Sequence, residues 1–143
     1  MKVLFGCDPN AMDMKNDLMK VAEKLGCEVV DMGSEDPIYA NTAIAVAEAV
    51  AAGKGDRGVL VCGTGLGMSI AANKFSGIRA ALCKNEEASK LSRSHNDANI
   101  VCIGARTTDF EEIKKIVSAF LETSFEAGRH QRRLEQITEI ENS

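Results

Sequence analysis

The stretch from Gly58 to Ser69, GVLVCGTGLGMS, decides the fold of this chain. It begins with an apolar run that is typical of a buried strand, and glycine then occupies every second position from 63 to 67. Glycines between a strand and a helix allow backbone N–H groups to turn inward and face an anion. The thiol of Cys62 opens this run. The stretch therefore predicts a strand, an anion-binding turn with a reactive group beside it, and the start of a helix.

The same alternation of short β-branched runs and longer helical patterns extends along the chain. Strands are predicted at Lys2–Gly6, Glu28–Asp31, Gly58–Cys62, Arg79–Leu82 and Ile100–Ile103. Helices are predicted at Met12–Leu25, Thr42–Ala52, Ser69–Lys74, Glu86–His95, Phe110–Glu122 and His130–Ile140. Strands that alternate with crossover helices form a parallel sheet covered on both faces, so we predict an α/β fold with five parallel strands. The last helix is amphipathic, and the sequence leaves open whether it packs on its own domain or on a neighbouring subunit.

The composition argues against several classes of protein. A length of 143 residues suits a single domain, which we place at residues 1–143. The formal net charge of -4 and the lack of a long basic tract argue against nucleic acid as a partner. No apolar run approaches the roughly 20 residues that span a bilayer, and the N-terminus carries no signal-peptide pattern. We therefore expect a cytoplasmic protein that does not associate with membranes.

The five cysteines lie at wide, irregular spacings and include no CxxC pair, which disfavours a structural zinc site. Four of them, Cys7, Cys27, Cys83 and Cys102, lie in or beside apolar runs, where a free thiol packs as a small hydrophobic group. Cys62 differs, because a glycine follows it directly at the end of a strand. The sequence indicates neither a metal site nor a cofactor.

Polar side chains stand at the ends of three predicted strands. Asp8 comes shortly after the first strand, Cys62 ends the third, and Arg106 follows the fifth. Parallel sheets bind ligands beyond the carboxyl ends of their strands. We therefore expect these three residues to contribute to one site.

The glycine turn resembles two nucleotide-binding patterns without completing either. The GxGxxG pattern of dinucleotide-binding proteins needs an acidic residue about twenty positions on, where this chain has Leu82 and Cys83. The Gly-Lys-Ser/Thr of a P-loop is also missing. The turn therefore suits a smaller anion, or negative charge that develops on a bound substrate, better than a dinucleotide.

Two further segments carry groups that suit a sugar phosphate. SHNDAN at Ser94–Asn99 contains His95, whose imidazole either exchanges protons with a sugar oxygen near neutral pH or is structural. In GRHQRR at Gly128–Arg133, Arg129 and Arg133 lie one helical turn apart. Their guanidinium groups either bind a phosphate or form a solvated helix face.

Together these groups fit one reaction, in which a phosphorylated polyol is held, its ring is opened and a proton moves between adjacent carbons. Removal of a proton beside a carbonyl needs a base at the carbon and hydrogen-bond donors for the enediolate oxygens. Cys62, as a thiolate favoured by the N–H groups of the turn, could be that base. The same N–H groups and Thr64 could stabilise the enediolate.

The motifs CGTGLGMSIAANK, GIRAAL, HNDAN, GAR and GRHQRR follow one another from residue 62 to residue 133. They resemble the ribose-5-phosphate isomerase B family, which includes galactose-6-phosphate isomerase subunits and related sugar-phosphate isomerases. The resemblance covers nearly the whole chain. It implies a Rossmann-like three-layer α/β/α fold and a cofactor-independent aldose–ketose isomerase. It also implies a homodimer or a dimer of dimers with active sites built from both subunits, and we expect the C-terminal helix to pack on the partner.

The resemblance further implies roles for individual residues. Cys62 looks like the base that forms the enediol and His95 like the residue that opens the ring, with Asp8 nearby and Thr64 at the reacting oxygens. The phosphate would be held by Arg106, Arg129, Arg133 and His130. The sugar would be contacted by Gly63, Gly65, Gly67, Ser69, Asn96, Tyr39 and Asn10.

Two positions depart from the family pattern. Pro9 follows Asp8 where the family usually has histidine, and a proline ring neither donates a hydrogen bond nor carries charge. The side chain of Asn10 could substitute for that contact. Ile38 stands within PIYAN, where ribose isomerases usually read Pro-Asp-Tyr.

These departures leave the identity of the sugar open. D-ribose 5-phosphate and D-ribulose 5-phosphate are the expected pair, and the alternatives with the same chemistry are a tetrulose phosphate, allose 6-phosphate and galactose 6-phosphate. A non-catalytic sugar-phosphate sensor is disfavoured because Cys62 and His95 are both present. A nucleotide-binding regulatory module would depend on the glycine turn alone.

Overall fold

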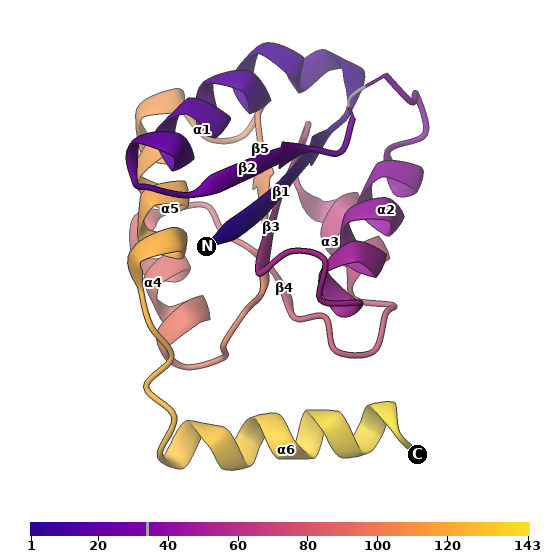
Figure 1. Ribbon diagram of the computed structural model, residues 1–143, viewed down its shortest axis with the longest axis vertical. Helices are drawn as coiled ribbons and strands as arrows, with labels where there is room; N and C mark the ends of the chain where they lie inside the picture. Colours follow the sequence, from indigo (N-terminus) through magenta and orange to yellow (C-terminus); the bar gives the residue numbers. More distant parts are fainter. Residues whose placement is uncertain (34) are drawn as a thin grey trace.

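Five parallel strands form one sheet in the computed structural model, which describes residues 1–33 and 35–143. The strands are β1 (Lys2–Cys7), β2 (Glu28–Asp31), β3 (Arg57–Cys62), β4 (Ala80–Leu82) and β5 (Ile100–Gly104). Their order across the sheet is β2-β1-β3-β5-β4 (Figure 1). The predicted α/β fold with a five-stranded parallel sheet is confirmed.

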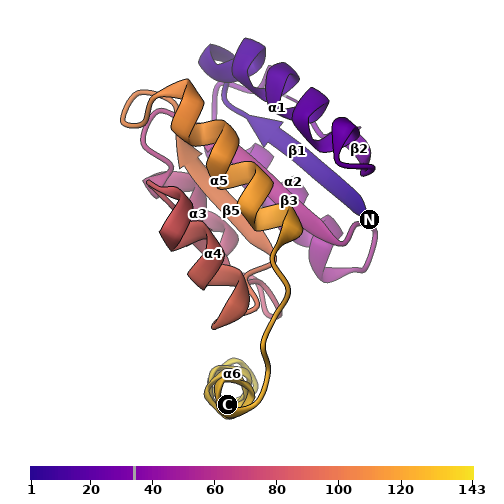
Figure 2. The same ribbon diagram turned by 90° about the vertical axis from the view of Figure 1, so that its left-hand side faces the viewer.

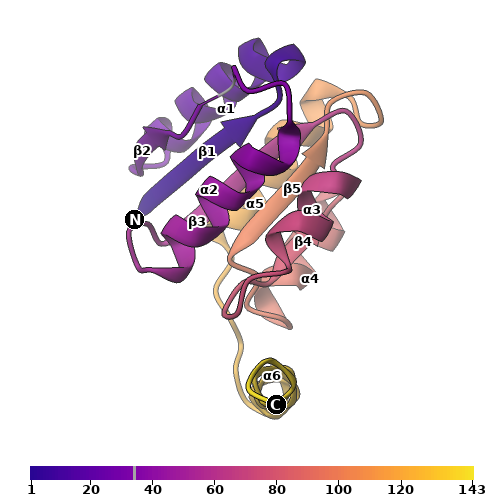
Figure 3. The same ribbon diagram turned by 90° about the vertical axis from the view of Figure 1, so that its right-hand side faces the viewer.

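Helices cover both faces of this sheet. The described α-helices are α1 (Met12–Lys24), α2 (Tyr39–Ala51), α3 (Leu66–Ala72), α4 (Glu86–Ser94), α5 (Phe110–Glu122) and α6 (Arg129–Glu141), and a short 3-10 helix, η1 (Pro9–Ala11), precedes α1. One face carries α1, α4 and α5 (Figure 2), and the other carries α2 and α3 (Figure 3). None of the described helices is long and apolar enough to cross a membrane.

Alternate residues of the central strands pack into the two layers. In β1, Val3 and Phe5 belong to the apolar cluster that contains residues of α1 and α5, whereas Leu4 belongs to the cluster that contains residues of α2 and α3. All three side chains are at most 2% exposed. Burial on both faces is why these strands are almost continuously apolar in sequence, and this pattern made the sheet predictable.

The helix after the glycine turn begins three residues earlier than the sequence predicts. Gly65 has a φ of 80°, and α3 begins directly after it, at Leu66 rather than at Ser69. Glycine adopts this left-handed conformation without steric cost, so the turn is completed within fewer residues than expected. Gly67 and Ser69 therefore lie in the first turns of a helix and not in a loop.

The helix after β2 also begins earlier, at Tyr39 instead of Thr42. The carboxylate of Asp36 accepts a hydrogen bond from the N–H of Ile38 at 2.8 Å and another from the side chain of Asn41 at 2.9 Å. These bonds fix the chain just before the helix and across its first turn. Tyr39 is consequently held at a defined helix terminus.

The C-terminal helix α6 lies apart from the three layers, beyond the edge of the sheet at which the strands begin (Figure 1). Its buried residues are His130 and Leu134, and the carboxylate of Glu141 accepts the N–H of Gly77 at 3.0 Å. Ile137 and Ile140 remain 40% and 73% exposed. The chain itself thus leaves part of the apolar face of α6 uncovered, and packing of this helix on a partner subunit stays a prediction.

Lys15 of α1 is a buried cation that pairs with Asp31 at the end of β2. The Nζ–Oδ1 distance is 2.7 Å, and the two side chains are 1% and 44% exposed. Partial burial raises the pKa of Asp31, but hydrogen bonds from Lys15 and from the N–H of Gly33, together with the Lys15 charge, outweigh it, so that the pKa lies below its ordinary value. The carboxylate therefore stabilises the fold above the pKa of an unfolded aspartate, and this contribution is lost as the pH falls through the lower folded-state pKa.

We expect the Asp31→Asn variant to lose about 2 kcal/mol of its free energy of unfolding at pH 7, because the Lys15 ammonium stays buried without its charge partner. Solvent screening at the half-exposed Asp31 keeps the loss below that of a fully buried pair. Urea denaturation measures the effect. The matched control is Asp36→Asn, which removes an exposed carboxylate with no buried cation beside it and should cost clearly less. Equal losses in the two variants would contradict the role given to Lys15.

Candidate active site

Cys62 ends β3 at the carboxyl edge of the sheet, with its sulfur against the glycine turn. Sγ accepts a hydrogen bond from the N–H of Gly65 at 3.1 Å, and the residue is 6% exposed. A backbone donor directed at the sulfur stabilises negative charge on it. Beside it, the hydroxyl of Thr64 accepts the N–H of Leu66 at 3.2 Å. The turn thus presents a nearly buried thiol that is prepared to act as a base or a nucleophile.

Close contacts surround Gly65 in the turn and Gly67 in the first turn of α3. A Cβ on Gly65 would lie 2.5 Å from Cδ1 of Leu82 and 3.1 Å from the carbonyl carbon of Ile103. A Cβ on Gly67 would lie 2.4 Å from the ring of Tyr39. The tyrosine ring therefore packs directly on the backbone at the start of α3, and its contact with a substrate stays a prediction.

Arg106 reaches the same edge of the sheet from the end of β5. Its N–H donates to the carbonyl oxygen of Gly63 at 2.9 Å, and its aliphatic stem lies over Gly63, where a Cβ would be 3.3 Å from Cδ of the arginine. The side chain is otherwise exposed. A guanidinium group is thereby available to an anion next to Cys62.

Asp8 lies directly after β1, next to the end of β3. Its N–H donates to the carbonyl oxygen of Val61 at 3.1 Å, and its carboxylate accepts the N–H of Asn10 at 3.0 Å. Pro9 occupies the first position of η1, where a missing N–H costs nothing. This departure from the family pattern is therefore compatible with the local fold.

The predicted ring-opening residue lies at the opposite, amino edge of the sheet. His95 caps the C-terminal end of α4, which runs back from β4 to the beginning of β5. Arg79, the residue before β4, donates from Nε to the carbonyl oxygens of Asn96 and Asp97, both at 3.0 Å. His95 and Asn96 are thus held where β4 and β5 begin.

The length of β5 separates the two groups of predicted site residues. Gly58 pairs with Ile100 and Cys62 with Gly104, four residues later, which corresponds to roughly 13 Å along the strand. The structure gathers around Cys62 the predicted residues Asp8, Tyr39, Gly63, Thr64, Gly65, Gly67 and Arg106. It does not bring to them, within one chain, the predicted residues His95, Asn96, Arg129, His130 and Arg133.

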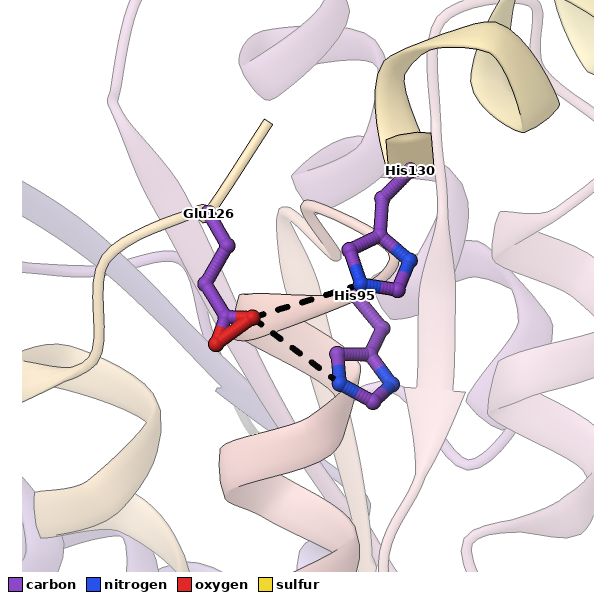
Figure 4. Close-up of side chains that lie close together, drawn as sticks. All are labelled: His95, Glu126 and His130. Carbon is purple, nitrogen blue, oxygen red and sulfur yellow. Dashed lines mark ion pairs between the residues drawn. The ribbon is translucent and has the colours of Figure 1, made fainter. Parts of the chain in front are cut away.

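At the amino edge, His95 and His130 stack on each other beside Glu126 (Figure 4). The ring centroids are 4.2 Å apart, the ring planes differ by 15°, and each Nε2 lies 4.0 Å from Oε2 of Glu126. His130 is 5% exposed beneath His95, and its Nδ1 lies 3.5 Å from Nη1 of Arg133. The structure therefore places His130 against the imidazole of His95, and a contact with phosphate stays a prediction.

The charges around His130 favour its neutral form. Removal from water lowers its pKa below the ordinary value, and the positive charges of His95, Arg129 and Arg133 lower it further, while the carboxylate of Glu126 acts in the opposite direction. A neutral imidazole thus lies beneath His95, close to two guanidinium groups.

Sequence reasoning missed two residues that organise this edge, Arg93 and Glu126. Arg93 is 5% exposed and donates to the carbonyl oxygen of Thr123 at 3.1 Å, to Oδ1 of Asp97 at 2.8 Å and to the carbonyl oxygen of Ala98 at 2.7 Å. It ties the end of α4 to the segment that leads into α6. Arg93 and Asp97 are four residues apart, but Asp97 lies beyond the predicted helix Glu86–His95, so helical periodicity did not predict the pair. Glu126 lies between two helices in a segment without periodicity, so no sequence pattern indicated its role.

Comparison with known proteins gives one consistent family. The family model for Ribose/Galactose Isomerase matches residues 3–137. Ribose-5-phosphate isomerase B of Escherichia coli is 47% identical, over 98% of this chain and 96% of the relative. D-erythrulose-4-phosphate isomerase of Pectobacterium atrosepticum is 38% identical, over 96% of this chain and 93% of the relative. The crystal structure of ribose-5-phosphate isomerase B from Mycoplasma genitalium with bound ribulose-5-phosphate has a TM-score of 0.92 at 35% identity, and the match covers 99% of this chain and 97% of that one.

Proposed function

The chain belongs to the Ribose/Galactose Isomerase family, and on this basis we propose that it interconverts D-ribose 5-phosphate and D-ribulose 5-phosphate. It is an aldose–ketose isomerase of the ribose-5-phosphate isomerase type. The observation that carries the proposed reaction is the sulfur of Cys62, which accepts the N–H of Gly65 at 3.1 Å at the carboxyl edge of the sheet. No cofactor takes part in the proposed steps.

The ribose pair is favoured by similarity over almost the full length of the chain. The Escherichia coli relative named ribose-5-phosphate isomerase B is the more similar of the two relatives described, and the Mycoplasma genitalium enzyme binds ribulose-5-phosphate. D-erythrulose 4-phosphate is the second candidate, because the Pectobacterium atrosepticum relative is named for it and Pro9, next to Asp8, departs from the pattern that the resemblance implies.

In the proposed proton transfer, Cys62 acts as the base. The thiolate takes the proton from the carbon next to the carbonyl, so that a C–H bond breaks, an S–H bond forms and the electron pair moves onto the oxygens as an enediolate. A proton passes from the C2 oxygen to the C1 oxygen of the enediolate, and the thiol then returns its proton to C1, which gives the ketose. The N–H of Gly65 stabilises the charged sulfur, and the hydroxyl of Thr64 with the N–H groups of Gly63 and Gly67 faces the enediolate.

Ring opening and phosphate binding are assigned to the amino edge of a second copy of the chain. His95 would exchange protons with the ring oxygen, Asn96 would bind a hydroxyl, and Arg129 and Arg133 would hold the phosphate. The 13 Å or so between this group and Cys62 within one chain favours a shared site. Leu66 and Ile70, 53% and 61% exposed on α3, offer an apolar surface beside the turn for such a partner. We therefore propose a homodimer with two shared sites.

Turnover of a panel of sugar phosphates tests the proposed identity of the substrate. We expect kcat/KM for D-ribose 5-phosphate to exceed that for D-erythrulose 4-phosphate, allose 6-phosphate and galactose 6-phosphate by at least about tenfold, because one unmatched hydroxyl or carbon costs 1.4 kcal/mol or more in a polar site. A Pro9→His variant serves as the comparison. If D-erythrulose 4-phosphate is preferred and Pro9→His shifts the preference towards ribose 5-phosphate, the second candidate is correct. Turnover of none of these compounds would contradict the proposed function as a whole.

A further inference from the structure

Three side chains with metal-binding groups converge at the amino edge of the sheet. One ligand atom from each of His95, Glu126 and His130 lies within 4.8 Å of the other two (Figure 4). Two imidazoles and one carboxylate form a donor set that binds Zn²⁺ and related first-row ions. We propose that this cluster is a binding site for Zn²⁺ or a similar divalent transition-metal ion, and that the bound ion inhibits the enzyme by occupying His95.

The distances within the cluster are close to those that a metal ion needs. Each Nε2 lies 4.0 Å from Oε2 of Glu126. A zinc ion bonds to imidazole nitrogen at about 2.0–2.1 Å and to carboxylate oxygen at about 2.0–2.2 Å, so tetrahedral binding brings two ligand atoms to roughly 3.4 Å. Each imidazole–carboxylate pair thus needs to close by about 0.6 Å, and the two imidazole nitrogens, which lie within 4.8 Å of each other, by at most about 1.4 Å.

The freedom of the side chains allows this closure. His130 is 5% exposed and serves as the fixed ligand, whereas His95 and Glu126 are 38% and 59% exposed. The two rings are stacked, so the imidazole of His95 must turn until its nitrogen points to the ion. The backbone keeps Glu126 next to the residue before His95, because the N–H of Glu126 donates to the carbonyl oxygen of Ser94 at 3.0 Å. The open side of the cluster leaves room for water as a further ligand.

The neighbouring charges set the strength of the site. Among the described residues, the carboxylate of Glu126 has no hydrogen-bond partner, so its charge is available to a cation. The guanidinium groups of Arg129 and Arg133 lie near His130 and repel a dication. The site is therefore weaker than a structural zinc site with four protein ligands. Binding is consequently reversible, as an inhibitory ion requires.

The inhibitory effect rests on the proposed role of His95, whereas binding of the ion does not. An imidazole nitrogen bonded to zinc cannot exchange a proton with a ring oxygen. Zinc should therefore slow the turnover of cyclic D-ribose 5-phosphate more than that of D-ribulose 5-phosphate. D-ribulose 5-phosphate has no furanose ring to open, because attack of its C4 hydroxyl on the carbonyl carbon would close a strained ring. The proton transfer at Cys62 does not pass through the imidazole of His95.

Calorimetric titration with zinc chloride tests the site directly. The protein is used as the Cys62→Ala variant, so that the reactive thiol does not contribute, and Glu126→Gln is compared with Glu139→Gln in that background. Glu139 lies on α6 nine residues after His130, or roughly 13 Å along the helix, so it controls for the change in charge. We expect Glu126→Gln to weaken zinc binding at least tenfold and Glu139→Gln to leave it unchanged. Equal zinc affinities in the two variants would refute the proposed zinc site.

Two further measurements separate the site from its effect. Cobalt(II) bound by imidazole and carboxylate gives only weak visible bands, whereas an intense near-ultraviolet charge-transfer band would show a cysteine ligand and overturn the assignment. Inhibition by zinc is then measured in the protein with Cys62 intact, relative to each variant's own activity without zinc. Zinc that binds as proposed but does not inhibit would refute the role of His95 in ring opening and leave the metal site established.

Discussion

The Cys62→Ala variant is expected to lose about a hundredfold to ten-thousandfold in kcat and to remain folded. The loss follows from removal of the group that carries the proton between the two carbons, and a positioned base contributes about 10²–10⁴-fold to such a step. The fold should survive because alanine fits the space of the thiol and the Gly65 N–H loses only a weak acceptor. Turnover of D-ribose 5-phosphate and a thermal unfolding curve measure the two parts.

The matched control is Cys83→Ala. Burial raises the pKa of the Cys83 thiol to about 11, so that it stays protonated at neutral pH, and it lies in the apolar cluster that contains residues of α1 and α5. This variant should keep nearly full activity. Full activity of Cys62→Ala, or a comparable loss in both variants, would refute the assignment of the base.

The second large effect is a recovery of activity. The Cys62→Ala and His95→Asn proteins should each be nearly inactive, yet an equimolar mixture should regain about a quarter of the wild-type specific activity after subunit exchange. Random exchange makes half of the dimers mixed. In each mixed dimer, one of the two shared sites combines the intact Cys62 of one chain with the intact His95 of the other. Activity is measured before and after exchange, with native mass spectrometry to count the mixed dimers.

A mixture of Cys62→Ala with Asp8→Asn provides the control for this experiment. Both residues lie at the carboxyl edge of the same chain, where the N–H of Asp8 donates to the end of β3. Every site in that mixture retains one defect, so no activity should return. Mixed dimers without recovery in the first pair would show that each site lies within one chain and would contradict the shared arrangement.

The sequence was sufficient to predict the sheet and to place Asp8, Cys62 and Arg106 of the candidate site at its carboxyl edge. Strands buried on both faces are apolar throughout, and residues that follow parallel strands must meet at one edge, so Asp8, Cys62 and Arg106 could be placed without coordinates. The predicted start of α3, at Ser69, was wrong by three residues, because the helix begins at Leu66. Its position depends on the left-handed conformation of Gly65, and a glycine in sequence permits that conformation without requiring it.

The amino-edge half was predictable only as separate residues. His95 and His130 were identified in their motifs, but nothing in the sequence places them against each other or against Glu126. Their arrangement arises from long-range contacts, such as that of the buried Arg93 with Thr123, which joins segments thirty residues apart. A charged residue with such contacts looks in sequence like part of an exposed helix face.

The placement of the two halves at opposite edges of the sheet has an evolutionary consequence. If each site draws on two chains, selection acts on the pairing of one chain's carboxyl edge with another's amino edge. After a gene duplication, either edge could decay in one copy and be retained in the other, because the mixed assembly would still hold one intact site per pair. Division of labour between paralogues is thus open to this fold through loss alone, without the invention of new residues.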